Sequence, residues 1–96
     1  MPSHERTRRF ERDWKALDEA DRRRFRTAFR RFDADLAVGR FRAGLRVKRI
    51  QGTDAIFEMT WAPDGRATFE FGPSVRSKEA HVIWRRIGTH AIFSQP

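Results

Sequence analysis

The spacing of apolar residues changes halfway along this sequence, and the change divides the chain into two kinds of secondary structure. Between residues 10 and 36 apolar side chains recur every three or four positions, as on one face of an α-helix. From residue 45 onward they recur at every second position, as on one face of a β-strand. The sequence therefore predicts helices followed by an antiparallel sheet in an α+β domain.

The first half predicts two helices. Phe10, Trp14 and Leu17 form the stripe of a short one. Asp18 and Asp21 offer capping side chains where a second helix begins, and Gly39 ends it. The apolar face of this second helix carries Phe25, Ala28, Phe29, Phe32 and Leu36. The arginines that fall largely on its other side are Arg22, Arg23, Arg26, Arg30 and Arg31. This second helix has the clearest period in the sequence.

The second half predicts strands. Residues 57–61 and 67–71 alternate apolar and polar side chains around the turn sequence Pro63-Asp64-Gly65, which indicates a β-hairpin with one buried face. Further strands are predicted at about 45–50 and 82–87, the latter after a polar loop over 73–80. We expect one domain over residues 1–96, with two N-terminal helices packed on an antiparallel sheet of about four strands. Residues 1–8 are expected to be flexible or to form a short edge strand.

The net charge of the chain limits the kinds of partner that it is expected to bind. It has 21 Lys and Arg against 13 Asp and Glu, a formal net charge of +8, and 18 of the cations are Arg. Arg binds phosphate through several donors, so this balance points to a polyanion or an acidic protein partner, although codon bias in a GC-rich genome also enriches Arg. Without Cys, disulfides and thiolate metal sites are excluded. No apolar stretch has the length of a membrane span or signal peptide, so we expect a cytoplasmic protein.

Three segments carry a resemblance to a known family. Leu45-Arg46-Val47-Lys48 leads into the strand near Ile56, and the segment 62–69 holds an aspartate in a turn followed by a basic strand. The segment Arg86-Ile87-Gly88-Thr89-His90-Ala91-Ile92-Phe93 is similar to the Arg-x-Gly-Thr-His-Ala…Phe terminus of YafQ-type toxins. Over about residues 10–93 the chain thus resembles the RelE/ParE superfamily of type II toxin–antitoxin systems, closest to the YafQ/RelE-type mRNA interferases, which have a curled sheet.

The resemblance implies a toxin that represses translation. Such proteins are metal-independent, ribosome-dependent endoribonucleases that cleave mRNA in the ribosomal A site. The 2′-hydroxyl of the RNA attacks the adjacent phosphate, which needs a base, an acid and positive charge near the phosphorane. The implied partners are a cognate antitoxin protein, the ribosome and mRNA, with no cofactor, metal or membrane.

The residues that match the family pattern form the candidate site. His90 is the first candidate for a general acid or base, and Arg86 for stabilising the phosphate charge. Asp64 and Arg66 complete the catalytic candidates, although Asp-Gly is a common turn pair and Arg66 also suits a solvent-exposed hairpin. Candidates for RNA binding are Arg46, Lys48, Arg49, Arg23, Arg26, Arg30 and Phe93. Each has an ordinary structural alternative as an exposed charge or core aromatic.

Two departures from the YafQ-type pattern keep other functions open. Thr60 stands where these toxins have a histidine, and Gly65 where they have an aromatic residue. One acid–base partner is therefore missing, with His81 and Glu58 as possible substitutes. The alternatives are a ParE-like inhibitor of DNA gyrase and a non-catalytic RNA- or protein-binding domain of the same fold.

Overall fold

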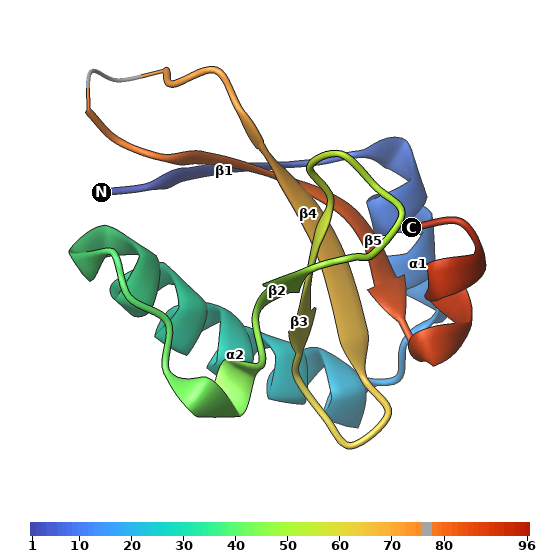
Figure 1. The fold of residues 1–96 in the computed structure, drawn as a ribbon. Helices are drawn as coiled ribbons and strands as arrows, with labels where there is room; N and C mark the ends of the chain where they lie inside the picture. The colour runs from blue at the N-terminus through green and yellow to red at the C-terminus, as the bar shows by residue number, and fades with distance from the viewer. Residues whose placement is uncertain (76–77) are drawn as a thin grey trace.

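A five-stranded sheet with two helices forms the protein in a computed structural model, which describes residues 1–75 and 78–96 (Figure 1). The elements in chain order are β1 (Ser3–Arg6), α1 (Arg8–Ala16), α2 (Glu19–Val38), the 3-10 helix η1 (Ala43–Leu45), β2 (Lys48–Arg49), β3 (Phe57–Thr60), β4 (Arg66–Gly72), β5 (His81–Gly88) and the 3-10 helix η2 (His90–Ser94). This is the predicted α+β class, with both helices ahead of the main sheet. None of the helices in the described ranges is long and apolar enough to cross a membrane.

The order of the strands is β1-β5-β4-β3-β2, and it corrects the prediction of a purely antiparallel sheet of about four strands. β1 pairs in parallel with β5, so that Ser3 lies opposite His81 and Arg6 opposite Trp84, while all other pairs are antiparallel. Of the two alternatives for residues 1–8, the structure shows the edge strand. The parallel pair forms because α1 and α2 carry the chain away after β1, and β5 returns beside it.

The second helix, α2, begins and ends at the residues that the sequence predicts. The side chain of Asp18 accepts a hydrogen bond from the backbone N–H of Asp21 and caps α2. At the other end Gly39 adopts a left-handed conformation (φ 80°), which glycine accommodates without strain. The strand predicted over 45–50 is shorter than expected, because Arg46 is left-handed (φ 48°) and leaves only Lys48–Arg49 in extended pairing.

The core lies between the sheet and the helices and is rich in aromatic rings. Phe32 of α2 and Phe69 of β4 have no exposed surface, and Trp84 of β5 is 2% exposed. The ring centroid of Trp84 lies 5.0 Å from that of Phe32 and 5.3 Å from that of Phe69. Aromatic side chains bury roughly 150–250 Å² each, so these three contribute much of the apolar burial available to a small domain.

Hydrogen bonds of two histidines, His4 and His81, connect β1 to α2 and β5. His4 bonds Asp33 of α2 through Nε2 (2.7 Å), and its Nδ1 accepts from the indole of Trp84 (3.1 Å). His81 bonds Ser3 through Nδ1 (2.7 Å) and Glu5 through Nε2 (2.6 Å). These contacts span about 30 to 80 positions of sequence, so periodicity in the chain does not predict them.

Candidate functional site

The turn between β3 and β4 meets the start of η2, and this brings Asp64 and His90 together. The register pairs Arg66 with Gly88, so the hairpin tip and the residues after β5 lie at the same end of the sheet. An Asp64 Oδ1 atom lies 2.9 Å from Nδ1 of His90. Both side chains are exposed, at 65% and 58%, and nothing in the described part of the chain bonds Nε2 of His90. A solvent-facing imidazole nitrogen backed by a carboxylate is equipped to move a proton.

Local contacts hold the two ends of this pair. Thr89 caps η2, because its Oγ1 accepts from the N–H of Ala91 (3.2 Å), and the cap sets the direction in which His90 leaves β5. In the hairpin Gly65 lies flat against Trp61. A β-carbon at position 65 would fall 2.6 Å from the indole ring, so only glycine allows this approach. The ring of Trp61 therefore packs directly against the turn that carries Asp64.

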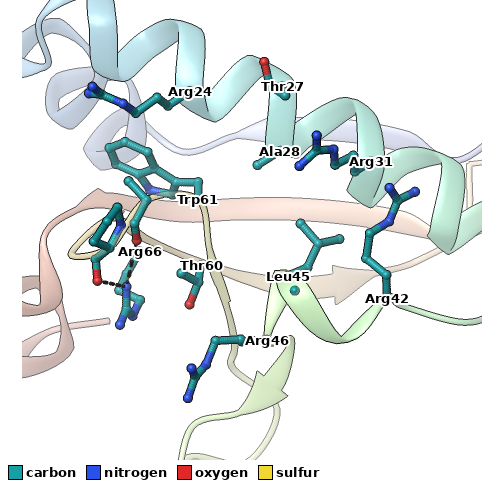
Figure 2. A pocket seen from close by; sticks show the side chains of 13 residues that line it. Arg24, Thr27, Ala28, Arg31, Arg42, Leu45, Arg46, Thr60, Trp61 and Arg66 are labelled. Atoms are coloured by element: carbon teal, nitrogen blue, oxygen red, sulfur yellow. Dashed lines mark hydrogen bonds between the residues drawn. The ribbon is translucent and has the colours of Figure 1, made fainter.

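Arg66 lies beside the turn at the start of β4. Its Nη1 donates to the carbonyl oxygens of Ala62 and Pro63, both at 3.3 Å (Figure 2). The same nitrogen donates to the carbonyl oxygen of Gly65 at 3.0 Å. These bonds use one terminal nitrogen, and within residues 1–75 and 78–96 its Nε and Nη2 make no hydrogen bond. Arg66 thus braces the turn and keeps donors for an anion near Asp64.

Arg86 forms an ion pair with the carboxylate of Asp13, a residue that the sequence does not indicate as part of the site. Its Nε and Nη2 donate to the two oxygens of Asp13 in α1 at 2.8 and 3.0 Å, and Nη1 donates to the carbonyl of Gln95. Asp13 also accepts from the backbone N–H of Ile87 at 3.1 Å. The hydrogen bonds that Arg86 donates to Asp13 raise the pKa of Arg86, so it stays charged. No bond joins Arg86 to the Asp64–His90 pair in the described residues.

A cleft lined by arginines opens between α2 and the β3–β4 hairpin (Figure 2). We call it the arginine cleft; its volume is about 530 Å³, and its charged lining residues are Arg24, Arg31, Arg42, Arg46 and Arg66. A second hollow of about 540 Å³ shares Arg24, Trp61, Ala62 and Pro63 with it and reaches Asp64 and Thr89. The two hollows therefore run along one side of the hairpin toward the Asp64–His90 pair.

Only Arg46 of the predicted RNA-binding set lines this cleft. Arg23, Arg26 and Arg30 are exposed on α2 outside it, and the guanidinium of Arg26 lies over the ring of Trp14, 5.4 Å from its centroid. Lys48 and Arg49 are exposed in β2, and the ring of Phe93 lies 5.8 Å from that of His90. Arg24 and Arg31 also line the cleft. Neither is among the seven predicted RNA-binding residues, although both belong to the arginine-rich stretch of α2 and their seven-residue spacing places them on one helical face.

The two substitutes for the missing acid–base partner lie in different places. His81 and Gly88 are the two ends of β5, and a strand rise of ~3.3 Å per residue separates them by about 20 Å. His81 therefore cannot act on the same phosphate as His90. Glu58 lies on β3 opposite Thr68 and Lys48 and is only 9% exposed, so the exposed position that a role as base requires is not found. Within the described residues no group of three potential metal ligands occurs.

Comparisons with known proteins identify the fold. No protein-family model matches the chain, and no curated protein does. Among solved structures, a chain of the RelB–RelE antitoxin–toxin complex from Methanococcus jannaschii matches over 94% of both chains, with 16% identity and a TM-score of 0.64. The chain has the fold of the RelE/YafQ toxins.

Two further structures share this RelE-like fold. YafQ from E. coli strain BL21(DE3) is 14% identical, with 97% of this chain and 98% of that chain covered and a TM-score of 0.62. A metal-bound toxin from Helicobacter pylori is 16% identical, with 95% and 97% covered and a TM-score of 0.64. The RelE-like fold of this chain therefore agrees with the resemblance carried by its C-terminal segment.

Proposed function

We propose that the protein is the toxin of a type II toxin–antitoxin system, a metal-independent, ribosome-dependent endoribonuclease that cleaves mRNA in the A site. The observation that carries the proposal is the exposed Asp64–His90 pair, which stands beside Arg66 at the end of an arginine-lined surface. The RelE-like fold supports the class, because several matching structures are toxins or toxin–antitoxin complexes.

We assign to His90 the role of a base. A carboxylate only accepts hydrogen bonds, so Nδ1 of His90 carries the hydrogen that Asp64 accepts, and the lone pair of Nε2 faces solvent. Nε2 takes the proton of the RNA 2′-hydroxyl, whose oxygen attacks the adjacent phosphorus while the bond to the 5′-oxygen breaks. Asp64 stabilises the imidazolium that forms, as in other carboxylate–histidine pairs.

The remaining roles follow from which donors are available. Arg66 offers Nε and Nη2 to the negative charge on the phosphorane. The donors of Arg86 are held by Asp13 and Gln95, so we assign it to fixing the end of β5 from which His90 projects. The proton for the departing 5′-oxygen is assigned to water, because Glu58 is only 9% exposed on β3.

The proposed partners are a cognate antitoxin, the ribosome and its mRNA. The net charge of +8 suits both an acidic or amphipathic antitoxin segment and ribosomal RNA. The matching RelB–RelE and DinJ–YafQ structures are complexes of a toxin with its antitoxin. The acidic or amphipathic antitoxin segment would fold on binding and cover the basic surface of the toxin.

Cleavage of mRNA on purified 70S ribosomes tests the proposal. The wild-type protein should cut within A-site codons, and His90→Ala should slow cutting by about 10²–10⁴-fold, the usual contribution of a general base. Asp64→Ala should slow it less, because the imidazole remains. Ser94→Ala is a matched control, since it removes one exposed hydroxyl from the same short helix.

Two results would contradict the proposal. If folded wild-type protein cuts no RNA with or without ribosomes, it is not a nuclease, and a gyrase supercoiling assay should then test the ParE-like alternative that Thr60 keeps open. If His90→Ala still cuts or still arrests growth like the wild type, the Asp64–His90 pair is not the catalytic centre.

A further inference from the structure

The arginine cleft holds positive charge that the protein itself does not neutralise. None of its thirteen lining residues is acidic. Arg24 is paired with Asp21 (2.7 Å) and Arg42 with Asp35 (2.8 Å), both from outside the cleft. Arg31, Arg46 and Arg66 have no carboxylate within ion-pair distance in the described residues. Like charges around one hollow repel each other, and an anion in the hollow relieves that repulsion.

The shape of the cleft fits an elongated anion better than a single small one. Arg24, Thr27, Ala28 and Arg31 follow one face of α2 and form one wall. Seven residues of helix at ~1.5 Å each separate the two arginines by about 10 Å. Thr60, Trp61 and Arg66 of the hairpin form the facing wall, and Arg46 lies on the same side, across from α2 (Figure 2).

We propose that the arginine cleft binds the backbone of single-stranded RNA that flanks the phosphate cleaved at His90. This inference rests on the proposed function and adds the path of its substrate. The cleft meets the second hollow at Arg24 and Trp61, and that hollow reaches Asp64 and Thr89, so one strand can occupy both. Single-stranded RNA fits because positive grooves with aromatic walls track its backbone without reading sequence.

RNA binding without cleavage tests the inference. In a His90→Ala background, the affinity for a fluorescein-labelled single-stranded RNA of about 12 nucleotides is measured by anisotropy at several NaCl concentrations. The double variant Arg31→Gln/Arg46→Gln should bind about tenfold more weakly and lower the slope of log K against log salt by about 1.4, about 0.7 for each lost phosphate contact.

The matched control is Arg8→Gln/Arg40→Gln. It removes two exposed arginines that lie outside the cleft. It therefore lowers the net charge by the same two units as Arg31→Gln/Arg46→Gln. Its affinity should fall less than about threefold with little change in slope. Equal weakening by both double variants would show that attraction is diffuse and would overturn the inference, as would the absence of RNA binding by the His90→Ala protein at low salt.

The indole N–H signals of the three tryptophans locate the bound RNA. Trp61 lines both hollows, whereas Trp84 is buried in the core, lines neither hollow and bonds His4. Adding RNA to ¹⁵N-labelled protein should shift the signal of Trp61 and leave that of Trp84 in place. A shift confined to Trp84 or Trp14 would place the RNA elsewhere. These measurements need no cleavage. A wild-type protein without nuclease activity would therefore contradict the proposed function and would not affect the test of RNA binding in the arginine cleft.

Discussion

At the scale of single residues, the ion pair of Asp35 with Arg42 makes a pH-dependent contribution to stability. Asp35 accepts from the side chain of Arg42 at 2.8 Å and from its backbone N–H at 2.9 Å, and these bonds lower the pKa of Asp35 from an ordinary 3.8 to about 2. A depressed carboxyl pKa stabilises the folded state above the unfolded value, and that gain is lost as the pH falls from about 4 toward 2. Asp35→Asn should lower the melting temperature at pH 7 and flatten its fall below pH 4. Asp54→Asn, at an exposed position, is the control.

The contact of Asp13 with Arg86 predicts coupled losses of stability. Asp13 accepts from both the guanidinium and the N–H of Ile87, so it joins α1 to the end of β5. Asp13→Ala and Arg86→Ala should each lower the free energy of unfolding, and the double variant should lose less than their sum by about 1–2 kcal/mol. Urea denaturation of the four proteins measures this coupling. If the losses of unfolding free energy are instead strictly additive, and only Arg86→Ala abolishes cleavage, then Arg86 stabilises the charge of the phosphate directly.

At the scale of elements, the β3–β4 hairpin depends on Gly65. An added β-carbon would lie 2.6 Å from the ring of Trp61, which is 9% exposed, so the ring or the turn would have to shift. Gly65→Ala should therefore lower the free energy of unfolding by about 1–3 kcal/mol, the usual cost of overpacking. Gly44→Ala is the control for stability, because nothing lies within 4 Å of its added β-carbon. Equal unfolding free energies for both variants would contradict the packing argument.

The elements that the sequence predicts are those whose signal is local. The helical stripe of α2, the cap at Asp18 and the hairpin around Gly65 are each specified within about ten residues, and the structure confirms them. β1 pairs with a strand almost eighty positions away, and only tertiary contacts select its parallel partner. Tertiary contacts between distant segments also produce the contact of Asp13 with Arg86 and bring together the two walls of the arginine cleft. Of the proposed site, the sequence thus indicates the residue types near His90 but not the surface that surrounds them.

At the scale of the whole molecule, a net charge of +8 is spread over a body of 35 × 26 × 24 Å. The Debye length is about 30 Å at 0.01 M salt and about 8 Å at 0.15 M, so charges on opposite faces repel only at low salt. Raising NaCl over this range should therefore raise the melting temperature by about 4 °C or more, which corresponds to about 1 kcal/mol for a domain of this size. Circular dichroism against temperature measures the shift.

A charge variant separates repulsion from other effects of salt. Arg23→Glu/Arg30→Glu changes two exposed residues of α2 and lowers the formal net charge from +8 by four units, two for each substitution. Its melting temperature should respond less to NaCl, because less repulsion remains to be screened. Salt also weakens the pairs of Asp35 with Arg42 and Asp13 with Arg86, which acts in the opposite direction. A wild-type melting temperature that falls with salt would mean that these pairs outweigh the repulsion, and that the basic surface costs the fold little when no polyanion is bound.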